Sequence, residues 1–219
     1  SRPPTARSRK RGLPGGSTSP RKRGRPASPV SWIALSAAGS TVLLSTTNHL
    51  CQDVAAVPLL WIAPLTVYLT TFIVAFDRPR HYRRWIYAAA TLVFTPLALV
   101  RGLPFMSQAG LTLLMLGAVC MLAHGELAAA KPRRHRSLTT YYLCISVGGA
   151  LGGVLVGLVA PLVFDRYWEW IAATLVAFIL ASFAIFRELR AAGRLTSLAS
   201  RVAFQAAAIA GVAGVARLH

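Results

Sequence analysis

Two small groups of polar side chains interrupt an otherwise apolar sequence, and they are the first candidates for chemistry. In the first group, His49 and Asp53 follow two threonines, Thr46 and Thr47, around a stretch without basic residues. Ionisable side chains beside hydrocarbon are costly, so they often mark a site for a solute or a proton. The carboxylate of Asp53 could balance a small cation. In the plainer alternative, the same polar groups only meet water at the end of an apolar run.

The second group is the tripeptide His124-Gly125-Glu126. Histidine titrates near neutral pH and a neighbouring carboxylate can tune it, so this pair could carry a proton. Residues two apart do not share one face of a helix, but Gly125 could end the helix and let the two side chains converge. The alternative is a polar helix end at the cytoplasmic surface. Two ligands are too few for a metal site, and we expect neither a metal nor another cofactor.

The sequence offers few residues that could catalyse a reaction in this chain alone. The sequence holds six acidic residues in all, and no nucleophile, base and orienting group occur together. Cys51, Cys120 and Cys144 are scattered without metal-ligand spacing, which favours simple packing roles. An intramembrane enzyme that uses His124 and Glu126 is therefore the least favoured hypothesis.

The elements that must position these groups are long apolar runs. Hydrophobic residues make up 55% of the 219 residues and charged residues only 14%, whereas soluble domains contain about 25% charged residues. About 20 apolar residues form a helix that crosses a bilayer. The sequence thus predicts an all-α, polytopic transmembrane bundle of about seven helices, with spans at residues 32–50, 54–76, 85–100, 105–123, 138–164, 168–186 and 202–216.

The basic residues alternate along the chain in a way that predicts topology. Outside the predicted spans, successive segments hold nine, none, four, one, four, one, four and one Lys or Arg. Cytoplasmic loops are the basic ones, so the N-terminus should be cytoplasmic. Residues 1–29 should form a disordered basic tail. Their net positive charge indicates anionic lipid headgroups as partners rather than nucleic acid.

A glycine-rich segment follows within the fifth predicted span. Gly148, Gly149, Gly152, Gly153 and Gly157 form small-x-x-x-small pairs, which allow helix backbones to approach closely in lipid. A phosphate-binding loop would need a preceding strand and a nearby lysine, and this segment has neither. We therefore expect these glycines to pack helices together.

Three strings together resemble the membrane region of bacterial spermidine-synthase-like proteins, which are fused major-facilitator/spermidine-synthase proteins. The strings are T-T-N-H-L-C-Q-D-V-A-A-V-P-L-L-W-I-A-P-L at residues 46–65, H-G-E-L-A at 124–128, and L-T-T-Y-Y-L-C-I-S-V-G-G-A-L-G-G at 138–153, followed by A-P-L-V-F at 160–164. The resemblance covers about residues 32–186. It implies a membrane region joined to a cytosolic aminopropyltransferase-like domain.

This sequence departs from that pattern because it contains no soluble α/β segment, no glycine-rich nucleotide loop and no acidic cluster for a polyamine. We therefore expect a non-catalytic membrane domain, a piece of a longer protein, which anchors or serves a synthase domain as its partner. The alternative is a major-facilitator-like transporter of a small cationic solute, with His49, Asp53, His124 and Glu126 as candidate solute or proton sites.

Overall fold

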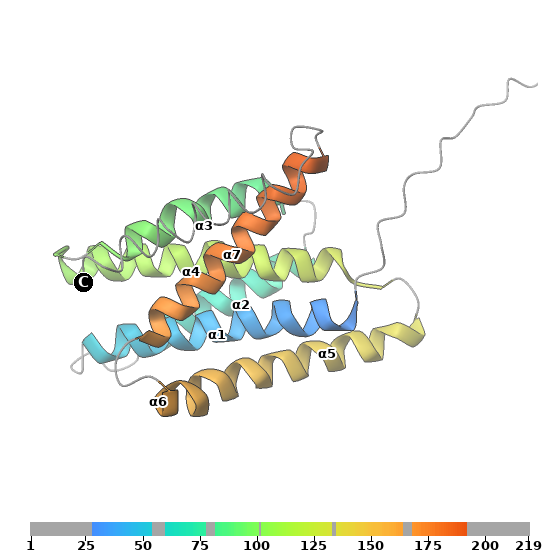
Figure 1. The fold of residues 1–219 in the computed structure, drawn as a ribbon, viewed down its shortest axis with the longest axis horizontal. Coiled ribbons are helices and arrows are strands. Elements are labelled where there is room, and N and C mark those ends of the chain that lie inside the picture. The colour runs from blue at the N-terminus through green and yellow to red at the C-terminus, as the bar shows by residue number, and fades with distance from the viewer. Residues whose placement is uncertain are drawn as a thin grey trace, which may run out of the picture.

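The computed structural model describes residues 28–53, 60–77, 82–100, 102–132, 135–163 and 168–191, and within these ranges every regular element is a helix. Figure 1 shows the helices as a bundle in which α7 crosses the others obliquely. Their bounds are α1 (Pro29–Asp53), α2 (Ile62–Asp77), α3 (Arg84–Ala98), α4 (Phe105–Ala129), α5 (His135–Val154), the π-helical turn η2 (Leu155–Val159), α6 (Ala160–Val163) and α7 (Trp168–Ala191).

The start of α1 follows from local sequence. Ser28 stands just before the helix, and its hydroxyl oxygen accepts a hydrogen bond from the Ser31 amide at 3.3 Å. Pro29 occupies the first helical position, where its missing N–H costs nothing and its fixed φ suits the helix. The apolar run therefore becomes helical directly after Ser28. Residues 1–27 lie outside the described residues, so the predicted disorder of the tail stays a prediction.

Helix α4 forms the centre of the bundle. It packs against α1, α2, α3 and α7, while α5 packs along α1 on the outside. The largest buried cluster joins Val42 of α1, Leu116 and Val119 of α4, and Ala173 and Ala177 of α7. Small alanines on α7 let it cross close to α3 and α1, as membrane helices often do.

The fifth predicted span is one continuous helical rod from α5 through η2 to α6, with a widened turn near its end. Pro161 lies in α6 and has no N–H to donate. The preceding turn is π-helical, and the Ala160 amide donates to the Leu155 carbonyl five residues earlier. Such a widened turn is one way in which a helix accommodates a proline.

Three helices in the described ranges are long and apolar enough to cross a membrane: Pro29–Cys51, Phe105–Ala129 and Ser137–Val163. Ile62–Asp77 and Trp170–Ile185 are apolar but shorter. Within the second predicted span, α2 starts at Ile62 after a turn at residues 60–61, and residues 54–59 lie outside the described part. Pro64 consequently occupies the first turn of α2, where proline does not kink a helix. The seventh predicted span, residues 202–216, also lies outside it.

Candidate functional site

The polar tripeptide of α4 lies inside the helix and not at its end. A helix end at Gly125 would have allowed His124 and Glu126 to converge, but α4 continues to Ala129. The Ala130 amide closes it by donating to the carbonyls of Glu126 and Leu127 at 3.0 and 3.1 Å. In a continuous helix, residues two apart are about 200° apart around the axis. His124 and Glu126 therefore belong to two separate sites.

His124 lies in the interior of the bundle, with only 2% of its surface exposed. Tyr68 and Phe72 of α2 present their rings edge-on to the imidazole, with ring centroids 4.8 and 5.2 Å away. Its Nδ1 atom lies 3.2 Å from the Thr71 hydroxyl. On the other side, a Cβ built on Gly39 of α1 would lie 3.6 Å from Nε2. The side chain thus stands between α1 and α2.

The hydrogen bonds of Thr71 favour one tautomer of a neutral His124. The Thr71 hydroxyl has one proton, and it donates this proton to the Tyr68 carbonyl at 2.8 Å. The oxygen is then the acceptor for His124 Nδ1–H. A neutral imidazole with a proton on Nδ1 carries its lone pair on Nε2. The basic nitrogen of His124 therefore faces Gly39 and α1.

Glu126 belongs to a polar cluster at the end of α4 and the start of α3. Arg84 forms an ion pair with the carboxylate, donating from Nε to Oε1 and from Nη2 to Oε2, the latter at 3.0 Å. The hydroxyl of Tyr82 donates to Oε1 at 2.9 Å. Such a two-pronged contact fixes the planes of both groups. The cluster joins the start of α3 to the last turn of α4.

Gly125 makes room for this cluster. A Cβ at Gly125 would overlap the ring of Tyr82, so the ring packs directly against the backbone of α4. Burial and then the Glu126 carboxylate raise the pKa of the Tyr82 phenol well above its usual value of 10.0. The phenol therefore stays protonated as a donor over the physiological range.

The first polar group is separated from His124 along α1. His49 stacks on Trp170 of α7, with ring centroids 4.6 Å apart and planes 10° from parallel. Gly39 is the α1 residue nearest His124 Nε2, and ten helical residues separate it from His49, a rise of about 15 Å. The side chain of Asp53 lies outside the described residues, so its predicted role remains a prediction.

The five glycines of the fifth span differ in their surroundings. A Cβ on Gly148 would lie 2.8 Å from Ser36 Cβ, and one on Gly152 would lie 2.6 Å from the Ala37 carbonyl oxygen. These two glycines, four residues apart, form the contact of α5 with α1. Gly149 and Gly153 would meet only side-chain atoms, the nearest at 3.5 and 3.9 Å. Gly157 takes no part in this contact, because its Cβ would have no neighbour within 4 Å.

Three residues of these sites had no marker in the sequence. Thr71 and Tyr82 are a plain threonine and tyrosine, and Arg84 counts only as one of four basic loop residues. Their roles depend on which helices become neighbours. The one available signal was Gly125, since a glycine within a helix often marks a close approach.

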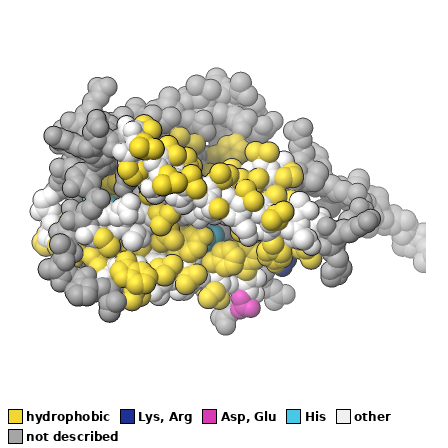
Figure 2. Space-filling view, turned by 90° about the horizontal axis from the view of Figure 1, so that it is seen from below, with side chains coloured by type: hydrophobic (Ala, Val, Ile, Leu, Met, Phe, Trp, Pro, Cys, Tyr) yellow, Lys and Arg dark blue, Asp and Glu magenta, His cyan; other side chains and the backbone are white. Residues whose placement is uncertain are grey.

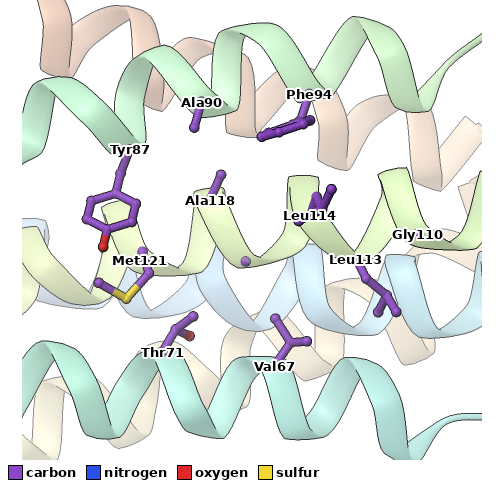
Figure 3. Close-up of a pocket in the computed structure, with 11 residues that line it drawn as sticks. Val67, Thr71, Tyr87, Ala90, Phe94, Gly110, Leu113, Leu114, Ala118 and Met121 are labelled. Carbon is purple, nitrogen blue, oxygen red and sulfur yellow. The ribbon is translucent and has the colours of Figure 1, made fainter.

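An open, apolar groove of about 620 Å³ lies between α2, α3 and α4. Figure 3 shows Tyr87, Thr71 and Met121 at one end, with both hydroxyls there, and Phe94, Leu113 and Gly110 toward the other end. Thr71 lines this groove and also binds His124. Thr71 thus connects the groove to the buried imidazole of His124.

Comparison with known proteins adds nothing to this geometry, because no family model, curated protein or solved structure matches the chain. The resemblance of the three strings therefore remains an expectation. Functional conclusions depend on the helices and contacts described above.

Proposed function

We propose that this chain is a multi-pass domain of the bacterial cytoplasmic membrane, with about seven spans and a cytoplasmic N-terminus. It is non-catalytic by itself and anchors a soluble synthase-type domain at the cytoplasmic face. One observation carries the membrane part of this proposal. Large aliphatic side chains cover the outer faces of the helices.

These exposed side chains form continuous stripes. Along the rod of α5, η2 and α6 they recur every three or four residues, and their exposed fractions reach 63% at Leu158 and 87% at Leu162; on α2, Ile73 is 63% exposed. Figure 2 shows one face of the molecule dominated by hydrophobic side chains. Soluble monomers rarely expose an apolar patch larger than about 300–600 Å². Lipid is the solvent that suits such a surface.

The positions of the described charged residues support the proposed orientation, with the N-terminus on the cytoplasmic side. Arg83, Arg84, Glu126 and Lys131 all lie at the ends of α3 and α4 that meet the basic loops. Segments rich in Lys and Arg remain cytoplasmic, so these ends belong to the cytoplasmic side. The basic N-terminal tail then lies on that side too, where anionic headgroups attract it.

The anchoring role is supported by a core built mainly for packing. The described cavity is apolar, and the described contacts between α1 and α5 depend on glycine and serine packing. The resemblance to fused synthase proteins supplies the expected partner, a synthase domain. These features suit a rigid support at the cytoplasmic surface.

Two measurements test this proposal together. Membranes that contain the full chain are washed with alkaline carbonate, which removes peripheral proteins, and we expect the chain to stay in the pellet. Purified chain is then reconstituted into vesicles with labelled spermidine inside or outside. We expect no flux above that of empty vesicles. Extraction by carbonate would refute the membrane domain, and spermidine flux would refute a purely anchoring role.

A second candidate function is transport of a small cationic solute coupled to protons, and His124 favours it. Buried ionisable residues within membrane spans usually mark a pathway. In this case the flux is expected to fall in His124→Gln and Glu126→Gln, and in Asp53→Asn. Flux that is unchanged in all three variants would remove the support for transport through these residues. His49→Gln tests the stacked histidine in the same assay.

A further inference from the structure

The groove between α2, α3 and α4 has the dimensions and polarity of a site for one lipid chain. Its volume of about 620 Å³ lies within the roughly 300–1,000 Å³ typical of small-molecule pockets. Along α4 it extends from Gly110 to Met121, a rise of about 16 Å. One leaflet of a bilayer offers about 15 Å of hydrocarbon, half of a core of about 30 Å.

The floor of the groove is open because its residues are small. Gly110, Gly117, Ala90 and Ala118 line it. A Cβ on Gly110 would meet nothing within 4 Å, and one on Gly117 would lie 3.5 Å from Val67. Larger residues at these positions would let α4 fill the space with its own side chains. Instead, the space stays free between the side chains of Phe94, Leu113 and Leu114 (Figure 3).

One end of the groove is polar and lies beside positive charge. The hydroxyls of Tyr87 and Thr71 lie at that end (Figure 3), and Tyr87 stacks on Tyr82 with ring centroids 5.9 Å apart. Arg83 is exposed one turn before Tyr87. Arg84, the next residue, is paired with Glu126, so Arg83 is the described arginine that can meet a ligand at this end. An anionic headgroup placed there would find complementary charge.

We propose that this groove binds one acyl chain of an anionic phospholipid from the cytoplasmic leaflet. The chain lies over Gly110 and Gly117, and the headgroup reaches Tyr87 and Arg83. This inference rests on the proposed membrane setting. A second copy of the protein would need a complementary ridge and would not explain the arginines at one end.

The test uses two glycines that tolerate a side chain equally well. The full chain is reconstituted in bilayers of phosphatidylglycerol and phosphatidylethanolamine and extracted with a mild detergent. Native mass spectrometry then measures which lipids remain bound to it. Gly110→Leu fills the groove. Gly157→Leu is the matched control, because a Cβ there also meets nothing within 4 Å and Gly157 lies outside the groove.

We expect the wild type and Gly157→Leu to retain one phosphatidylglycerol in preference to phosphatidylethanolamine. In Gly110→Leu, retention should fall at least about fivefold, equivalent to ~1 kcal/mol. Arg83→Gln should abolish the preference between headgroups while a lipid is still retained. Equal retention in both glycine variants, or no headgroup preference in the wild type, would overturn the proposal.

Other occupants give other results. A shift from dimer to monomer in Gly110→Leu would show that a second copy fills the groove. Efficient cross-linking of Leu114→Cys to a cysteine placed within residues 202–216 would show that the chain fills it itself. Either result overturns the lipid site. Carbonate extraction distinguishes a failure of the lipid site from a failure of the membrane domain. If the chain stays in the pellet but Gly110→Leu retains as much lipid as the wild type, only the lipid site is contradicted.

Discussion

At the scale of single residues, the two parts of the His124-Gly125-Glu126 tripeptide face different surroundings. His124 is enclosed by aromatic side chains and by Thr71, whereas Glu126 pairs with Arg84 at the ends of α3 and α4. The first arrangement keeps a basic nitrogen away from water, and the second holds two helix ends together. A shared proton site is replaced by one buried base and one structural ion pair.

Gly125 offers a direct test of the cluster around Glu126. In Gly125→Ala the new methyl group overlaps the Tyr82 ring, so the ring must swing away and its hydrogen bond to Glu126 is lost. We expect a destabilisation of about 1–3 kcal/mol, as for other overpacked sites, measured by thermal unfolding in detergent. Gly117→Ala is the control, because its Cβ makes only an ordinary contact at 3.5 Å. The cost should shrink in the Gly125→Ala, Tyr82→Leu double variant, and a cost that stayed the same would contradict the overlap.

Tyr82 also predicts a pH dependence. Its pKa is raised in the folded protein by burial and by Glu126, while in the unfolded chain it lies near 10. The folded state therefore holds the phenol proton more tightly. Its contribution to stability is fully present below about pH 10 and is lost as the pH rises above it.

The measurement compares the unfolding temperatures of wild type and Tyr82→Phe between about pH 9 and pH 11.5. Wild type should lose more stability over this range than Tyr82→Phe. Tyr142→Phe serves as control, since Tyr142 is exposed, and it should follow the wild type. Parallel curves for wild type and Tyr82→Phe would show that the phenol ionises normally.

At the scale of elements, the contact between α1 and α5 depends on which face of α5 each glycine occupies. Gly148 and Gly152 share a face that lies against the α1 backbone, and Ser36 of α1 donates a hydrogen bond to the Ile145 carbonyl at 2.7 Å beside them. Without a hydrophobic force between helices in lipid, such close backbone packing and interhelical hydrogen bonds provide the stability.

Gly152 and Gly153 are adjacent in the sequence, but we expect opposite effects on stability when each is replaced by alanine. Gly152→Ala brings its methyl group to 2.6 Å from the Ala37 carbonyl oxygen and 2.8 Å from Ser40 Cβ, so α1 and α5 must move apart. We expect a lower unfolding temperature in detergent, with a loss of about 1–3 kcal/mol. Gly153→Ala meets only Leu44 at 3.9 Å, and it should be neutral or stabilising by up to about 1 kcal/mol through helix propensity. Equal effects in the two variants would contradict the observed face of α5.

At the scale of the whole molecule, apolar outer faces and charged helix ends suit a bundle that spans a membrane. Large aliphatic side chains of α2 and of the rod of α5, η2 and α6 are exposed, and Arg84 and Glu126 lie at the ends of α3 and α4. The alternation of basic segments is the basis of the proposed orientation. In that orientation, the basic tail and the start of α4 fall on opposite sides of the membrane.

Single cysteines can verify this orientation. In a chain without Cys51, Cys120 and Cys144, a cysteine at Ser8 should react with an impermeant maleimide only in inside-out vesicles. A cysteine at Ser107, which is exposed at the start of α4, should react only in right-side-out vesicles. The reverse pattern, or labelling of both from one side, would contradict the proposed topology.

The sequence by itself determined the helical class and the approximate spans of the described helices. Runs of apolar residues leave the backbone few alternatives in lipid, although the first helix starts at Pro29, which the prediction had placed in the tail. The ends were less certain. The length of α4 was underestimated because Gly125 is a weak helix former, and only its packing against Tyr82 shows why the helix tolerates it there.

The tertiary structure alone decided the partners of the polar residues. His124 pairs with Thr71, 53 residues away, and Glu126 with Arg84, 42 residues away. No spacing in the sequence encodes such pairs, because they arise only when α2 and α3 pack beside α4. The same holds for the glycines, since a repeat of small residues shows that close packing is allowed, while the neighbouring helix decides that Gly148 and Gly152 use it.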